Sequence, residues 1–180
     1  MSEEHEWAKE PTSPDELLTF HKVLRRDPQR YLRIVNEWIR RDPGNSHGYF
    51  SRHFGWMKIG EPRQALLDLN KVLELERDPD PICLMARGEV YCHLGEYENA
   101  LADFNRAEDI DPVRWETDIV FGLLYQADAH ARLGNERAAL ACCARLPDSF
   151  WTPGIHGAPR GGKEEIAEEL RRRAKAAQRQ

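Results

Sequence analysis

One segment of the chain has residue types and a spacing that could bind phosphate. Residues 157–163 follow the pattern Gly-x-x-x-x-Gly-Lys, in which backbone N–H groups and a lysine surround a phosphate group. Three features argue against a nucleotide: Glu164 replaces the magnesium-binding hydroxyl, Pro159 removes an N–H group, and no β-strand is expected before the loop. Two alternatives remain, namely that Arg160 and Lys163 hold an acidic group of a partner, or that the segment is a linker without a ligand.

The other reactive side chains have no catalytic or metal-binding spacing. The histidines are scattered, with neither an H-E-x-x-H motif nor a clear Ser/His/Asp set. The four cysteines form no C-x-x-C pair and no zinc-ligand pattern; they are Cys83, Cys92, Cys142 and Cys143. Small apolar residues packed between helices in a reducing compartment explain them better than disulfides do. We therefore expect no enzyme activity, no metal site and no cofactor.

Length and charge narrow the class of protein further. The chain has 180 residues and a net charge of −5, with acids and bases interleaved, so we expect no binding to nucleic acid. The longest uncharged apolar stretch, around 119–125, is far shorter than the roughly 20 residues of a membrane-spanning helix. Residues 1–7 are acidic and do not resemble a secretory signal. These observations predict a cytoplasmic protein without membrane partners.

Turn-forming residues recur along the chain at intervals that indicate a repeat. Asp-Pro pairs occur at 27–28, 42–43, 78–79 and 111–112, and Gly60, Gly95 and Gly134 follow the second, third and fourth of these pairs. Glycine just past a helix can close its C-terminus, and proline is tolerated in a first helical turn. Each unit is therefore expected to be a helix, a glycine turn, a second helix and an Asp-Pro turn. The glycines are 35 and 39 residues apart, near the roughly 34-residue period of helix–turn–helix repeats.

The third unit, residues 81–114, shows the repeat pattern most fully. Its signature positions are Leu84, Gly88, Tyr91, Gly95, Tyr97, Ala100, Phe104, Ala107 and Pro112. On these residues the unit resembles a tetratricopeptide repeat (TPR), in which small residues let the two helices approach and aromatic residues fill the layer between repeats. Arg87 departs from the leucine that is usual at its position. The resemblance implies an all-α, right-handed superhelix of helix pairs.

The resemblance extends, with weaker matches, over residues 14–146. The expected units are 14–45, 46–79, 81–114 and 115–146, preceded by a tail at 1–13. His53 stands where the family has a small residue, which predicts looser helix packing or an altered helix crossing in the second unit. A Gly/Pro-rich linker at 147–162 and a C-terminal capping helix at 163–180 follow. Glutamates and arginines four residues apart on that last helix are expected to form ordinary surface pairs.

A stripe of side chains next to the packing positions is expected to line the concave face of the stack. In TPR proteins that face comes mainly from the first helix of each pair. The stripe is mostly apolar, with two acids; its members are Phe50, Phe54, Met57, Ile82, Met85, Glu89, Phe121, Leu124 and Asp128. It lacks the basic and amide residues with which some family members grip a C-terminal carboxylate. It therefore suits an apolar segment that carries one or two basic residues.

These observations predict a non-catalytic scaffold, an adaptor or chaperone-like module, that binds a peptide segment of another protein in the groove. One alternative is a homo-oligomeric structural protein that buries the same stripe against a copy of itself. Another is that tight curvature or the chain's own C-terminal segment buries the stripe. The remote alternative is a phosphate- or nucleotide-binding protein that uses residues 157–163.

Overall fold

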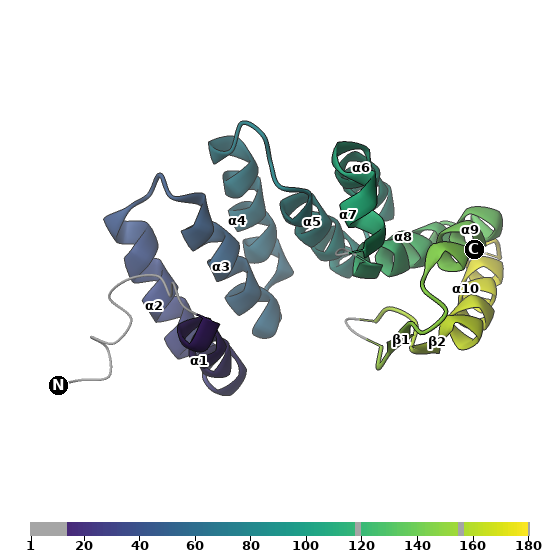
Figure 1. The fold of residues 1–180 in the computed structure, drawn as a ribbon, viewed down its shortest axis with the longest axis horizontal. Helices are drawn as coiled ribbons and strands as arrows, with labels where there is room; N and C mark the ends of the chain where they lie inside the picture. Colours follow the sequence, from purple (N-terminus) through teal and green to yellow (C-terminus); the bar gives the residue numbers. More distant parts are fainter. Residues whose placement is uncertain (1–13, 118–119, 155–156, 180) are drawn as a thin grey trace. The chain divides into compact units, whose positions relative to one another are not determined.

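The computed structural model describes residues 14–117, 120–154 and 157–179 (Figure 1). Helices joined by short turns account for most of these residues, so the predicted all-α, TPR-like repeat fold is confirmed. The chain divides into two compact units, residues 1–79 and residues 80–180. Each unit is built from helix–turn–helix pairs, which we number along the chain.

The first unit contains pairs 1 and 2. Pair 1 is α1 (Pro14–Arg26) with α2 (Pro28–Arg41), and pair 2 is α3 (Ser46–Lys58) with α4 (Pro62–Leu75). In pair 1 the Phe20 ring stacks on Tyr31 with centroids 4.4 Å apart and lies 4.8 Å from the Trp38 ring. These aromatic residues are buried and form the core between the two helices. Helix α3 packs against both α2 and α4.

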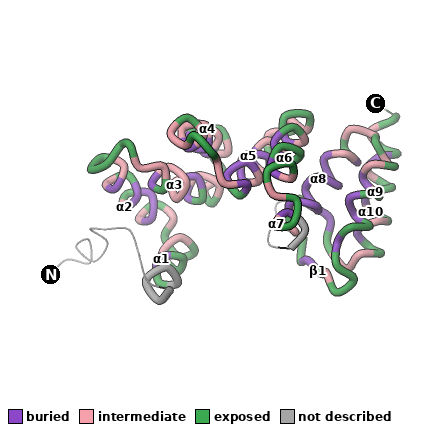
Figure 2. Tube along the Cα trace, turned by 45° about the horizontal axis from the view of Figure 1, so that its top comes forward, coloured by how far each residue is buried: buried purple, intermediate pink, exposed green. Residues whose placement is uncertain are grey.

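The second unit contains pairs 3 and 4 and a C-terminal segment. Its helices are α5 (Pro81–Leu94), α6 (Tyr97–Ile110), α7 (Pro112–Thr117), α8 (Val120–Arg132), α9 (Glu136–Arg145) and α10 (Lys163–Ala177). Pair 3 is α5 with α6, and pair 4 is α8 with α9. Helix α8 is buried over most of its length (purple in Figure 2), because α6, α7, α9 and α10 all pack against it. It is the central element of this unit.

The predicted glycine turns are present in both units. Gly60, Gly95 and Gly134 have φ angles of 79°, 77° and 77°, a region that side chains with a Cβ disfavour. At the end of α5, the Gly95 N–H bonds to the carbonyl of Cys92, and the next N–H bonds to that of Tyr91. This arrangement closes the helix and reverses the chain, as the spacing of the glycines predicts.

Close helix approach depends on small residues, and their positions differ between pairs. A Cβ added to Gly88 would overlap with the Phe104 ring, so α5 and α6 can meet only at a glycine. In pair 2 the expected small position holds His53, which is buried. There Gly55, two residues later, touches Leu32 of α2 instead.

The residues between pairs 3 and 4 form a helix of their own. Helix α7 carries Trp115, whose side chain is completely buried beside Gly122 of α8. A Cβ at that glycine would overlap with the Trp115 ring, which explains the glycine. The α7 insertion therefore fills the layer between the two pairs and lengthens this repeat to 39 residues.

Candidate functional site

Pair 2 is held together by a largely buried ion pair between its two helices. Arg52 of α3 donates to both carboxylate oxygens of Asp68 of α4, at 2.9 and 2.6 Å. The Trp56 indole N–H donates to the same carboxylate at 2.9 Å, and Arg52 also reaches Asn36 of α2 at 2.8 Å. Because Asp68 is nearly completely buried, these donors supply the polar contacts that burial requires.

Pair 3 repeats this clasp at the same spacing. Arg87 of α5 donates to both carboxylate oxygens of Asp103 of α6, each at 2.7 Å, and the two residues are again 16 apart. The guanidinium also lies 5.7 Å from the centre of the Tyr91 ring. The contacts of Arg87 with Asp103 and Tyr91 explain why an arginine stands here in place of the usual leucine. The sequence analysis missed the clasp, although the equal Arg–Asp spacing in two units was a signal for it.

The α3 stripe is a short aromatic surface. Phe54 is 38% exposed and meets the Phe50 ring edge-on, with centroids 5.5 Å apart. The buried His53 ring lies beneath both, 3.9 Å from Phe54, and its Nδ1 contacts the Phe50 carbonyl. Met57 follows on the same face and is partly exposed. The first unit therefore presents an accessible apolar stripe on α3.

The α5 stripe combines apolar and acidic side chains. Ile82 is 36% exposed, and Met85 and Glu89 are half-buried one and two turns further on. Glu89 hydrogen-bonds the Tyr125 hydroxyl of α8, whose pKa is raised first by burial and then by the Glu89 charge. Burial, with the nearby Asp128 and Glu89 charges, raises the pKa of Cys92 to about 12, so this thiol is not a nucleophile at neutral pH.

The α8 stripe is mostly inaccessible. Phe121 is 37% exposed and packs edge-on against Phe150, with ring centroids 5.5 Å apart. Leu124 is completely buried, and Asp128 is only 5% exposed. Of the three predicted α8 positions, the structure therefore presents Phe121 at the surface and holds the other two inside the second unit.

Asp128 is held by the C-terminal helix. Its carboxylate accepts from Arg173 of α10 at 2.5 Å and from Arg132 of α8 at 3.1 Å. The Arg173 guanidinium also donates to the Gly157 carbonyl at 2.8 Å and pairs with Glu169 at 2.7 Å. The predicted surface pair on α10 is therefore one part of a buried network that joins α8, α10 and the preceding loop.

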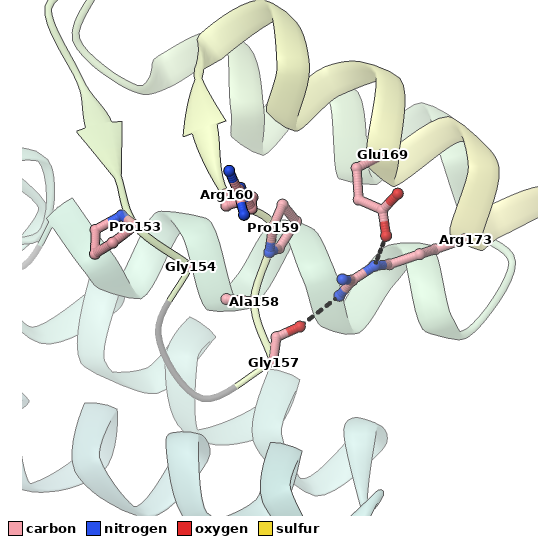
Figure 3. Close-up of a pocket in the computed structure, with 8 residues that line it drawn as sticks. All are labelled: Pro153, Gly154, Gly157, Ala158, Pro159, Arg160, Glu169 and Arg173. Atoms are coloured by element: carbon pink, nitrogen blue, oxygen red, sulfur yellow. Dashed lines mark hydrogen bonds and ion pairs between the residues drawn. The ribbon is translucent and has the colours of Figure 1, made fainter.

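The loop before α10 forms a pocket of about 520 Å³ with that helix (Figure 3). It is lined by Pro153, Gly154, Gly157, Ala158, Pro159, Arg160, Glu169 and Arg173. Arg160 is exposed, whereas the Arg173 guanidinium is already bonded to Glu169 and Gly157 (dashed in Figure 3). The Arg173 charge in this pocket is therefore already paired, with Glu169 and with Asp128.

The resemblance of residues 157–163 to a phosphate loop does not extend to its geometry. Lys163 Nζ donates to the Leu146 carbonyl at 2.8 Å and to Asp148 at 3.1 Å, so it fixes the end of α9. The expectation that no strand precedes the loop was wrong. Strand β1 (Trp151–Thr152) pairs antiparallel with β2 (Gly161–Gly162), and this two-residue ribbon only closes the loop.

Two absences hold for residues 14–117, 120–154 and 157–179. In these ranges no group of three or more His, Cys, Asp and Glu side chains is placed to hold a metal ion. None of the helices that the structure describes is both long and apolar enough to cross a membrane. All four cysteines are free thiols. Of the scattered histidines, His156 lies outside the described residues.

Comparisons with known proteins agree with the fold. A tetratricopeptide repeat model matches residues 81–112, and no curated protein matches the chain in sequence. The crystal structure of MamA superposes with a TM-score of 0.64 at 16% identity, covering 94% of this chain and 95% of that one. MamA from Desulfovibrio magneticus RS-1 gives 0.64 at 14%, covering 99% and 97%. TTC0263, a thermophilic TPR protein of Thermus thermophilus, gives 0.56 at 20%, covering 92% and 91%.

The helix pairs and the match at 81–112 define the class: a helical-repeat protein of the kind that serves as a protein–protein interaction scaffold. Residues 81–112 match the tetratricopeptide repeat, so the family signature is concentrated in pair 3, and the fold of the chain is similar to that of TPR proteins.

Proposed function

We propose that the chain binds apolar or amphipathic segments of another protein through two apolar stripes, one on the first helix of pair 2 and one on the first helix of pair 3, each within its own unit. The observation that carries this proposal is the exposure of large apolar side chains on those helices, namely Phe54 on α3 and Ile82 on α5. Exposed apolar side chains that lie one turn apart on a helix are suited to receive the apolar face of a peptide. The proposed contact set also includes Phe50, Met57, Met85 and Phe121.

Glu89 supports a preference for segments that contain a basic residue. It lies on α5 after Met85 and is half-buried, so a lysine or arginine that reached it would form a partly desolvated ion pair. The second unit contains an internal example, in which Arg173 satisfies Asp128. A partner with apolar residues followed by a basic residue therefore fits the α5 stripe best.

The experiment is a peptide selection against the full chain, followed by binding measurements on the selected sequences. We expect enrichment of apolar residues together with lysine or arginine. The double variant Phe54→Glu/Met85→Glu should lower affinity at least about tenfold, because it places charge in both stripes. A matched control, Leu67→Glu/Val113→Glu, changes two exposed apolar residues on α4 and α7 and should bind normally. Equal loss in both variants would overturn the proposal.

The alternative of a homo-oligomer uses the same stripes and predicts a different result. Light scattering on the purified chain would then give a mass that falls to the monomer value in Phe54→Glu/Met85→Glu. For the remote alternative at residues 157–163, the measurement is thermal unfolding with and without ATP. Because Lys163 is engaged with Leu146 and Asp148, we expect no ATP-dependent shift.

A further inference from the structure

Charge is distributed unevenly along the chain, in contrast to the interleaving that the sequence analysis inferred. Residues 17–60 contain nine lysines and arginines and only three acids, a net charge of +6. Residues 1–16 have one lysine and six acids, and residues 61–180 have a net charge of −6. The first unit therefore contains a basic region within an acidic chain.

Four exposed cations of this region lie near the turn of pair 1. Only Asp27 separates the end of α1 from the start of α2. Lys22 lies five residues before this turn and Arg33 six after it, so a helix rise of about 1.5 Å per residue places each within roughly 10 Å of it. We call the exposed cations here the basic cluster; its members are Lys22, Arg25, Arg26 and Arg33.

Among the described residues, no hydrogen bond or ion pair engages the side chains of the basic cluster. The acid within it, Asp27, accepts from the backbone N–H of Arg30 at 2.8 Å and so caps α2. Farther along α2 the situation differs, because Glu37 bonds to both Arg40 and Arg41. The basic cluster thus concentrates like charges within about one Debye length, which raises the energy of the isolated fold.

The core of pair 1 holds the basic cluster in place. Phe20, Tyr31 and Trp38 pack together on the inner side of α1 and α2, and Val23 and Leu24 pack against them. The cations occupy the remaining, exposed positions of the same two turns. The cluster is therefore a fixed surface on ordered helices.

We propose that the basic cluster binds an acidic segment of a protein partner, at a surface separate from the apolar stripes. Arginine makes up three of its four members, and its planar guanidinium pairs with carboxylates through two hydrogen bonds. An acidic peptide can be short enough to contact the basic cluster alone. A nucleic acid duplex or an anionic membrane is an extended polyanion, and the net charge of −5 on the whole chain disfavours its approach.

The test uses the full chain and two dye-labelled peptides. The acidic peptide repeats Glu-Asp-Ser, and the neutral peptide repeats Gln-Asn-Ser. Fluorescence anisotropy measures the binding of each. We expect the acidic peptide alone to bind, and its affinity to fall at least about tenfold between about 50 and about 200 mM salt. The triple variant Arg25→Glu/Arg26→Glu/Arg33→Glu should lose at least about tenfold in affinity. Where that triple does not fold by circular dichroism, the Gln triple at the same positions replaces it.

The matched control makes the same charge change elsewhere, in Lys58→Glu/Arg63→Glu/Arg137→Glu, and should stay within about twofold of wild type. Equal loss in the control, equal binding of both peptides, or tighter binding of a DNA duplex or phosphatidylserine vesicles than of the acidic peptide would overturn the proposal. The Phe54→Glu/Met85→Glu variant should still bind the acidic peptide, so failure here and failure of the proposed stripe function can be told apart.

Discussion

Pair 3 and pair 4 belong to the same unit but are stabilised by different contacts. In pair 3 the Arg87–Asp103 clasp joins the two helices directly. The positions 39 residues later hold Gln126 and Cys142, and Gln126 donates to Asn105 of α6 at 2.8 Å instead of bonding within its own pair.

The buried acid of pair 4 is Asp128, and its strongest partner comes from outside the pair, from Arg173 of α10. An internal repeat has a neighbouring pair on each side, but the last pair has one open side that must be covered. Helix α10 covers it with Ile166, Leu170 and Ala174, all completely buried. The comparison indicates that pair 3 contains its own polar clasp, whereas pair 4 depends on the C-terminal helix.

The largest effect is expected from breaking the pair 3 clasp. Asp103→Ala should lower the free energy of unfolding by about 4 kcal/mol, because it removes the carboxylate that pairs with the mostly buried Arg87 charge. The double variant Arg87→Leu/Asp103→Leu should recover most of this loss, since it removes both charges and restores the usual family residue. Urea unfolding followed by circular dichroism measures both, with the exposed Asp109→Ala as control. A double variant less stable than Asp103→Ala would contradict the clasp.

Removing the apolar contact of α10 should have the next largest effect, and it should be local to pair 4. Leu170→Ala is expected to cost about 3 kcal/mol, because it leaves a cavity against α8 and α9. Amide hydrogen exchange should show protection lost first in α8 and α10, with α5 and α6 still protected. Simultaneous loss in all four helices would show that pair 3 also depends on α10.

The ionic contact of α10 should contribute less than its apolar face. Arg173→Gln is expected to cost about 2 kcal/mol, since it removes a charged donor from the buried Asp128 carboxylate. The neighbouring Arg172→Gln changes a residue whose side chain is 74% exposed, and it should cost under about 0.5 kcal/mol. Thermal unfolding of the two variants measures the difference. An equal loss of stability in both would show that the Arg173–Asp128 contact does not stabilise the fold.

The smallest expected effect is the loss of stability at low pH. Hydrogen bonds from Arg172 and then Arg173 lower the pKa of Glu169 from its ordinary 4.5 to about 2. A lowered pKa in the folded state means that the stabilisation is complete above about pH 4.5 and is lost as the pH falls toward 2. The stability difference between the native chain and Glu169→Gln should therefore shrink over that range. A difference that stays constant with pH would show that Glu169 acts only through packing.

Much of the repeat architecture could be predicted from short-range residue patterns. Gly60, Gly95 and Gly134 mark turns because a positive φ angle is a local backbone property, and proline acts equally locally at the helix starts. The basic cluster was also present in the sequence, as an excess of lysine and arginine in residues 17–60, but only the turn at Asp27 brings its members together.

The amino-acid sequence by itself determined the helices, their turns and the family of the fold, because these depend on backbone conformation and on spacing along one helix. Tertiary structure alone decided which charged and apolar residues remain accessible. Phe54 and Asp128 occupy equivalent stripe positions, yet one is 38% exposed and the other 5% exposed. Burial depends on which distant helix covers a face, and the contact of Arg173 with Asp128 spans 45 residues of chain. A pattern of nearby residues does not encode such a contact.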